Sequence, residues 1–294
     1  MRTLFRKQLD RFFSTSKAFR ELRTAFERPE ARISVSGPRG AFLPLLIGEL
    51  HGRRKAVSLV VTPTEREAEN VQQDLEGFTD AGVALFPWWG TAAYEGASPS
   101  ASVFGDRVHV LSRLLAGEPV LVVAPLRAFL APVPDPAWFR EQRLAVERGQ
   151  AFDPQATALR LAGMGYLRVP HVSIRGEFAV RGEVVDVFVA GHDRAVRVTL
   201  DFDRVGDIRW FNPLDQSSTG SIPRIDIPPA REVVFTPVLL ETMKQGLLSL
   251  GFAEGEVTEL ADGIASDPER DGVEAFYPLC FPESHSLLEY LGKD

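Results

Sequence analysis

The sequence predicts an α/β protein: a parallel-sheet domain with an inserted α+β domain that carries an antiparallel sheet. Over residues 33–130 short apolar runs alternate with helical segments, which is typical of a parallel sheet covered on both faces. From Tyr166 onward the apolar residues recur with a period of two, as in half-buried antiparallel strands. The length of 294 residues and the hydrophobic share of 45% are sufficient for two domains with buried cores.

The composition excludes several classes of protein. The longest apolar runs, residues 42–50, 57–61 and 119–126, are shorter than the ~20 residues that a membrane helix needs. The basic N-terminus is not followed by the apolar segment and cleavage site of a secretory signal. Cys280 is the only cysteine, so the chain forms no internal disulfide and no cysteine-based zinc site. We therefore expect a folded, soluble protein of the reducing cytoplasm.

Charge is unevenly distributed within the net charge of −7. Residues 1–32 carry nine Lys/Arg and four Asp/Glu, whereas residues 238–294 carry three and twelve. In the first segment phenylalanine and leucine recur at helical spacing among the basic residues, which predicts an amphipathic helix in two pieces, broken near residues 14–16. We expect its phenylalanines to dock on the neighbouring domain, although such a helix also suits a membrane surface or a nucleic acid.

The next segment has the layout of a phosphate-binding loop. Residues 33–42 predict a short strand, a glycine-rich turn and the start of a helix that runs to about Leu50. Turn chemistry explains Gly37 and Gly40 without any ligand, and Arg39 is placed to contact an anion at the start of the helix.

The chemistry of such a loop needs a lysine for the β- and γ-phosphates and a Ser/Thr hydroxyl for Mg²⁺. With Gly37 as the first glycine of the motif, these positions hold Leu43 and Pro44. With Gly40 as the second glycine they hold Ala41 and Phe42. The sequence therefore predicts a degenerate loop, comprising Gly37, Arg39 and Gly40, that does not support hydrolysis of Mg-ATP.

The remainder of the first domain continues the alternation. Thr64 and Glu67 form a capping-box pattern before a helix expected to reach about Phe78. Trp88 and Trp89 lie on a proline- and glycine-rich loop, where we expect them to cap the core rather than stack on bases. The remaining elements are strands at residues 56–63, 83–86 and 120–124 and a helix at residues 106–115. Residues 33–130 thus predict a doubly wound, RecA-like domain.

A proline-dense junction at residues 130–136 marks the boundary to the second domain. Residues 137–165 are expected to be helical, and turns are expected at residues 191–193 and 205–207. Strands are expected at residues 178–181, 184–189, 196–202, 208–211 and 225–227. The predicted organisation is a basic helical segment (residues 1–32), the RecA-like domain (33–130), the α+β domain (131–237) and an acidic segment (238–294).

The second domain presents arginines but no catalytic constellation. Arg181, Arg197 and Arg209 lie in or beside predicted strands, with Arg168 and Arg175 nearby. Arginine anchors on a sheet face are typical of protein recognition, although exposed strand positions favour charged residues in any case. The five histidines lack metal-ligand spacing, and no nucleophile-elbow motif occurs. We therefore predict no catalytic residue, metal or cofactor for this chain.

Several stretches resemble the UvrB-homology module of bacterial transcription-repair coupling factor, Mfd. They are residues 59–63, residues 86–94 with Ser98 and Pro99, and residues 165–188, of which residues 176–182 are the most specific part. The resemblance extends over about residues 30–237, with a weaker echo at residues 275–281.

The resemblance implies a function. Members of the family are large ATP-dependent DNA translocases that displace stalled RNA polymerase and recruit the excision-repair protein UvrA. This chain resembles the recruiting part, an inactive relative of the UvrB helicase domain. The motor motifs do not occur in it, so we expect a fragment whose parent protein also uses ATP, Mg²⁺, double-stranded DNA and RNA polymerase.

By motif position, the resemblance implies that Arg168, Arg181 and Arg197 contact UvrA. The sequence departs from UvrB at Ala179, where UvrB commonly has arginine, and at Thr199, where it has glutamate. A UvrA-recruiting adaptor is the leading interpretation. The alternatives are a UvrB-like helicase or excinuclease subunit, and a DNA-binding module led by the basic helix.

Overall fold

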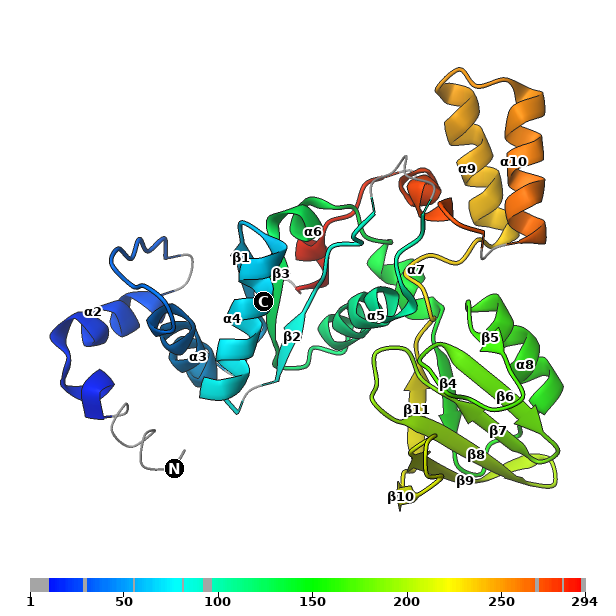
Figure 1. The fold of residues 1–294 in the computed structure, drawn as a ribbon, viewed down its shortest axis with the longest axis horizontal. Coiled ribbons are helices and arrows are strands. Elements are labelled where there is room, and N and C mark those ends of the chain that lie inside the picture. Colours follow the sequence, from blue (N-terminus) through cyan, green and yellow to red (C-terminus); the bar gives the residue numbers. More distant parts are fainter. Residues whose placement is uncertain are drawn as a thin grey trace.

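The fold is a chain of packed units, seen in a computed structural model (Figure 1). The structure describes residues 11–28, 31–54, 56–80, 82–91, 97–267, 270–281 and 283–291. The N-terminal helices lie at one end, a small parallel sheet lies in the middle, and at the other end a large antiparallel sheet and a helical hairpin diverge (Figure 1). None of the helices in these ranges is long and apolar enough to cross a membrane.

The N-terminal segment breaks where the sequence predicts. Residues 11–15 are helical, and α2 (Lys17–Phe26) begins after Ser16, whose hydroxyl accepts a hydrogen bond from the Phe19 N–H at 3.4 Å. Phe13 and Phe19 are buried against Leu46. Leu46 belongs to α3 (Phe42–Arg54), so the expected docking of these phenylalanines is confirmed.

The parallel sheet has three strands in the order β1 (Ser58–Thr62), β3 (Leu121–Pro125) and β2 (Val83–Leu85). Helix α4 (Glu65–Phe78) covers one face through the cluster around Leu75, and α5 (Ala101–Leu115) covers the other. Both strand pairs are parallel and β3 is buried throughout, so the expected covered parallel sheet is confirmed. The side chains of Thr64 and Ser100, the residues just before α4 and α5, cap the two helices.

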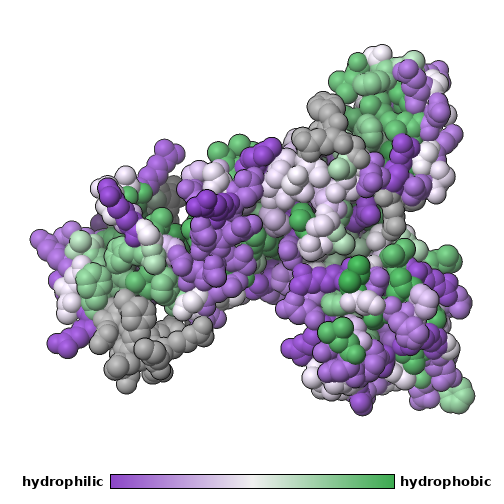
Figure 2. Space-filling view, in the orientation of Figure 1, coloured by the Kyte–Doolittle hydropathy of each residue, from purple (hydrophilic) through white to green (hydrophobic). Residues whose placement is uncertain are grey.

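The prediction of a strand before the glycine-rich turn is wrong. Residues 31–39 form no helix or strand, and Ile33 and Val35 are 37% and 47% exposed. The central strand β3 is already paired on both sides, and residues 33–38 instead line a groove of about 540 Å³ beside α2. In Figure 2 apolar residues accordingly surface over α2 and α3, whereas the outer side of α4 is hydrophilic. The RecA-like arrangement therefore stays a prediction, and a three-stranded parallel α/β unit is what the structure shows.

The segment expected to be helical from residue 137 to 165 contains a strand. After the short helix α6 (Leu126–Leu130), β4 (Leu144–Glu147) lies between α7 (Pro136–Glu141) and α8 (Pro154–Gly163). In β4 buried and exposed residues alternate, and the strand pairs antiparallel with β11 (Arg224–Ile227). The prediction is wrong here because the alternation spans only four residues and the strand depends on its distant partner β11.

The second sheet has six strands in the order β10-β9-β8-β7-β6-β5, antiparallel except for the β5–β6 pair. Their bounds are β5 Leu167–Arg168, β6 Glu177–Arg181, β7 Val184–Val187, β8 Ala195–Asp201, β9 Arg204–Phe211 and β10 Ser218–Ser221. The five predicted strands are confirmed, whereas β4, β5 and β10 are additional. The turn predicted at residues 205–207 is wrong: the chain turns at Phe202, with φ of +56°, and buried Val205 pairs with Leu200.

The acidic C-terminal segment packs onto the rest of the chain. Helices α9 (Pro237–Ser249) and α10 (Glu254–Ser266) form a hairpin, followed by the short helices η1 (Val273–Leu279) and η2 (Leu287–Tyr290). Leu287 and Tyr290 enter the largest core cluster, which also contains residues of both sheets.

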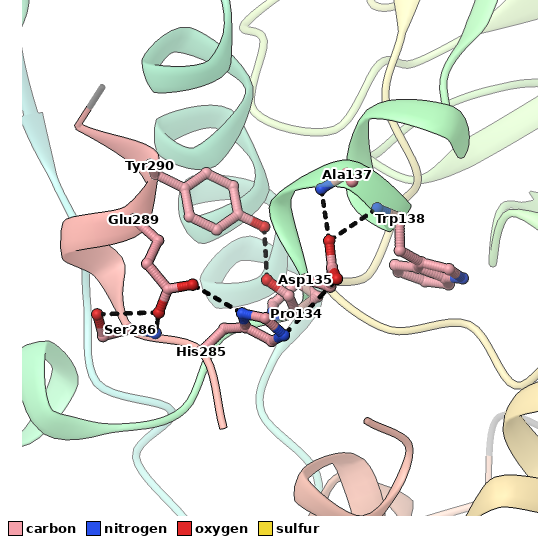
Figure 3. Close-up of polar contacts among 8 residues, drawn as sticks. All are labelled: Pro134, Asp135, Ala137, Trp138, His285, Ser286, Glu289 and Tyr290. Carbon is pink, nitrogen blue, oxygen red and sulfur yellow. Dashed lines mark hydrogen bonds and ion pairs between the residues drawn. The ribbon is translucent and has the colours of Figure 1, made fainter. Parts of the chain in front are cut away.

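Polar contacts hold residues 285–290 against the start of α7 (Figure 3). The Tyr290 hydroxyl donates to the Pro134 carbonyl at 2.9 Å. His285 lies between the carboxylates of Glu289, at 2.7 Å, and Asp135, at 3.6 Å. Asp135 also accepts the N–H groups of Ala137 and Trp138, so it caps α7 while it faces His285.

Candidate partner-binding site

The glycine-rich turn has the predicted backbone but not the surroundings of a phosphate loop. Gly37 and Gly40 adopt φ of +99° and +55°, conformations that glycine tolerates best. Arg39 is exposed, and no strand leads into the turn. A phosphate loop aims its backbone N–H groups from the end of a strand, so only the turn of the motif is present here.

Three neighbouring strands bring a carboxylate and two guanidinium groups together on the sheet. Asp186 on β7 lies directly opposite Arg197 on β8, and Arg181 lies at the end of β6. The carboxylate accepts hydrogen bonds from Arg197 Nε at 2.7 Å, Arg197 Nη2 at 2.8 Å and Arg181 Nη2 at 2.5 Å. This cluster of Arg181, Asp186 and Arg197 is called the arginine pair below.

The two guanidinium groups still reach the surface. The Asp186 side chain is 2% exposed, whereas those of Arg181 and Arg197 are 40% and 24% exposed. Arg197 also donates to Gln216 Oε1 at 2.8 Å, and its guanidinium lies 4.3 Å from the centre of the Phe211 ring. The hydrogen bond to Asp186 raises the pKa of Arg197 above its ordinary value, so this group stays charged.

Arg168 does not join this cluster. It lies on the edge strand β5, in register with Phe178, whose ring belongs to the main core. Paired residues of neighbouring strands point to the same side of a sheet, so Arg168 lies on the opposite side from Arg181 and Arg197. The side chain is exposed, and no residue in the described ranges forms a hydrogen bond or ion pair with it. Of the three predicted contact residues, the structure brings together two.

Arg175 and Arg209, the other two arginines that the sequence singles out, form ion pairs within the chain. Arg209 pairs with Asp207 on its own strand. Arg175 pairs with Asp193 and, at 3.0 Å, with Asp106 on α5, and so links the sheet to the first unit. These two arginines hold the fold together in addition to any role at the surface.

Sequence reasoning missed the residues that hold the arginine pair, namely Asp186, Phe211 and Gln216. A signal for Asp186 was available, because it is the only charged residue within β7 and the hairpin register places it beside Arg197. Gln216 gave no signal, because its contact depends on the course of the loop between β9 and β10.

Trp88 and Trp89 cap the core, as expected. Trp89 Nε1 donates to Glu232 Oε2 at 2.7 Å, and its ring meets Tyr277 edge-on at 5.9 Å. The Trp88 ring lies 4.7 Å from the guanidinium of Arg127. Both indoles are thus engaged within the fold.

A buried polar network joins α5 to the segment that follows β11. Arg107 and Glu232 form a two-pronged ion pair at 2.6 and 2.9 Å, with side chains 0% and 1% exposed. Arg107 also donates to the Pro87 carbonyl at 2.7 Å and lies 3.9 Å from the Phe86 ring centre. The network joins α5, the loop after β2 and the segment after β11, so it fixes the two units against each other.

Beside this pair, α5 touches the loop after β7. The rings of His109 and His192 meet edge-on at 5.4 Å, and His192 stacks on Trp210 at 5.1 Å. Burial, with His192 close by, lowers the pKa of His109 to about 4, so the ring is neutral at physiological pH. Among the residues that the structure places, no group of three or more His, Cys, Asp or Glu side chains is arranged to hold a metal ion.

The second sheet lies in a segment that matches a known family model. Residues 144–233, which contain both strands of the small sheet and all six of the large one, match the family model described as the UvrB interaction domain. This segment is therefore similar to the UvrB interaction domain, and the arginine pair lies on its sheet.

The chain as a whole is homologous to transcription-repair-coupling factors, which confirms the resemblance seen in the sequence. The protein of that name from Mycobacterium bovis is 34% identical over 256 residues, 80% of this chain and 20% of the relative. Those of Haemophilus influenzae and Escherichia coli are 28% and 22% identical, over 92% and 83% of this chain. The chain spans between 20% and 24% of the length of these relatives.

Proposed function

We propose that this chain is a protein-interaction module that recruits UvrA in transcription-coupled nucleotide excision repair, as part of a transcription-repair-coupling factor. Two observations support the proposal: the match of residues 144–233 to the UvrB interaction domain and the relatives' shared name. In this reading the remainder of a longer, cytoplasmic protein is an ATP-dependent DNA translocase that acts on stalled RNA polymerase. ATP, Mg²⁺, double-stranded DNA and RNA polymerase are then partners of that remainder.

The arginine pair is the single observation that carries the proposal at the level of residues. Arginine is enriched among the residues that dominate binding energy at protein interfaces, because its planar fork forms several directed hydrogen bonds. Arg181 and Arg197 are both oriented by a buried carboxylate and both partly exposed. We propose that they form the centre of the UvrA contact and that Arg168, on the sheet edge, lies at its periphery.

Alanine at either member of the pair is expected to weaken UvrA binding. Truncation of an arginine at the centre of an interface typically costs about 2 kcal/mol, or about 30-fold in affinity. We expect Arg181→Ala and Arg197→Ala to show at least this loss and Arg168→Ala a smaller one, measured by titration calorimetry with purified UvrA.

The matched control is Arg224→Ala, because Arg224 is an exposed arginine of β11 that pairs with Asp226 on its own strand. The affinity of Arg224→Ala for UvrA is expected to stay within about twofold of that of the unmodified protein. Unchanged affinity in all three variants, Arg168→Ala, Arg181→Ala and Arg197→Ala, would rule out this surface as the contact.

We propose further that the chain itself is non-catalytic. The residues at the lysine and hydroxyl positions of the turn, Leu43 with Pro44 or Ala41 with Phe42, offer neither a cation for phosphates nor a ligand for Mg²⁺. A titration with Mg-ATP is expected to give no stoichiometric binding and no turnover. Tight binding that is lost on Gly37→Val substitution would instead support the UvrB-like helicase alternative.

A further inference from the structure

Asp186 is an acidic residue at the centre of a surface proposed to bind through positive charge. Its side chain is 2% exposed, and an ionised carboxylate at such a position is stable only when its oxygens are fully hydrogen-bonded. Three N–H groups of Arg181 and Arg197 fulfil this requirement. The carboxylate is thus shared between two strands that flank its own.

The geometry leaves donors on the outer side of the pair. A guanidinium has five N–H donors. Arg197 uses Nε on Asp186 and Nη2 on Asp186 and Gln216, whereas Arg181 uses only Nη2 in the described contacts. Nη1 of both residues and Nε of Arg181 have no recorded partner among the described residues, and the cluster keeps one net positive charge. These properties suit one carboxylate of a partner protein.

We propose that Asp186 is a positioning residue that fixes Arg181 and Arg197 as one preformed receptor for an acidic side chain of the partner. This inference rests on the proposed function and refines it. Long arginine side chains lose much rotamer freedom when they bind, and a contact ordered before binding avoids that loss at the interface. Gln216 and Phe211 support the arrangement by holding Arg197 from its other sides.

Positioning and simple charge attraction predict opposite results for one substitution. Asp186→Asn removes a negative charge and so raises the net charge of the cluster by one. If the surface attracted its partner only through charge, this variant would bind an acidic partner more tightly. If Asp186 orients the two arginines, the variant binds more weakly although it is more positive.

The test is the affinity for purified UvrA of Asp186→Asn against the control Asp207→Asn. Asp207 lies on the same face, pairs with Arg209 and gives the same change of charge without touching the arginine pair. We expect about tenfold weaker binding for Asp186→Asn, from lost preorganisation, and a change within about twofold for Asp207→Asn.

A double-mutant cycle separates positioning from a general loss of structure. In an Arg197→Ala background one of the two groups to be oriented is absent, so the effect of Asp186→Asn is expected to shrink to about threefold or less. An undiminished effect in that background would show a purely structural role and overturn the inference.

Where Asp186→Asn does not fold, Gln216→Asn replaces it. Gln216 adopts φ of +59°, which asparagine tolerates, and the shorter side chain withdraws from Arg197. About threefold weaker binding is expected for this variant. If the aspartate and glutamine variants bind as tightly as the unmodified protein while Arg181→Ala and Arg197→Ala lose binding, the positioning role is wrong and the proposed function stands. If the arginine variants also keep full affinity, the proposed function itself fails.

Discussion

Glu232→Ala is expected to lower the free energy of unfolding by about 3–5 kcal/mol, the range observed when one member of a buried ion pair is removed. The substitution leaves the Arg107 guanidinium, which is 0% exposed, without its counter-charge and without two hydrogen bonds. It also removes the acceptor of the Trp89 N–H. Urea unfolding followed by circular dichroism measures the loss.

Two variants separate charge from packing and from surface effects. Glu232→Gln has nearly the volume of the original residue, so most of the loss is expected to remain if the buried charge causes it. Glu118→Ala breaks the pair with Arg113, where the glutamate is 53% exposed, and is expected to cost less than ~1 kcal/mol. A Glu232→Ala loss as small as that of Glu118→Ala would contradict the central role of the buried network.

The position of this network connects stability with the proposed function. Arg107 lies on α5 of the first unit, whereas Glu232 follows β11 near the end of the matched segment. Loss of the pair is therefore expected to loosen the segment of residues 144–233 relative to the parallel sheet, while the arginine pair on β6 to β8 keeps its own contacts.

Local signals in the sequence predicted elements well where the structure depends on near neighbours. Thr64 caps α4 as its pattern with Glu67 indicates, and the period of two after Tyr166 identifies the strands of the large sheet. The same reasoning failed where a distant partner decides whether a segment forms a strand. Residues 33–36 alternate like a strand, but they pair with none of the three strands and line the groove beside α2 instead.

Buried charges show the same dependence on distant partners. Arg107 sits in an amphipathic helix where a charged residue normally faces water, yet its partner Glu232 is 125 positions away. Arg181 and Arg197 were predicted from the family resemblance, but not that one carboxylate holds both. The resemblance therefore singles out Arg181 and Arg197 as candidate contacts, whereas their orientation depends on contacts with Asp186 and Gln216 in the folded sheet.

The contact between α5 and the loop after β7 gives the second large effect: Gly191→Ala is expected to lower the free energy of unfolding by about 3 kcal/mol. Gly191 has φ of +79°, and a Cβ there would lie 2.3 Å from His109 Cβ and 2.8 Å from the Gly105 carbonyl oxygen. Both neighbours belong to α5, so the helix must move away from the sheet. Left-handed strain of about 1 kcal/mol and overpacking of about 1–3 kcal/mol add up to this loss.

Gly149→Ala is the matched control, because Gly149 has nearly the same φ, +82°, and no atom within 4 Å of an added Cβ. It is expected to show the strain alone, about 1 kcal/mol. The difference between the two variants, measured by urea unfolding, is then the contribution of the close approach between α5 and the loop after β7. Equal losses would contradict this prediction and would mean that α5 accommodates the added Cβ without cost.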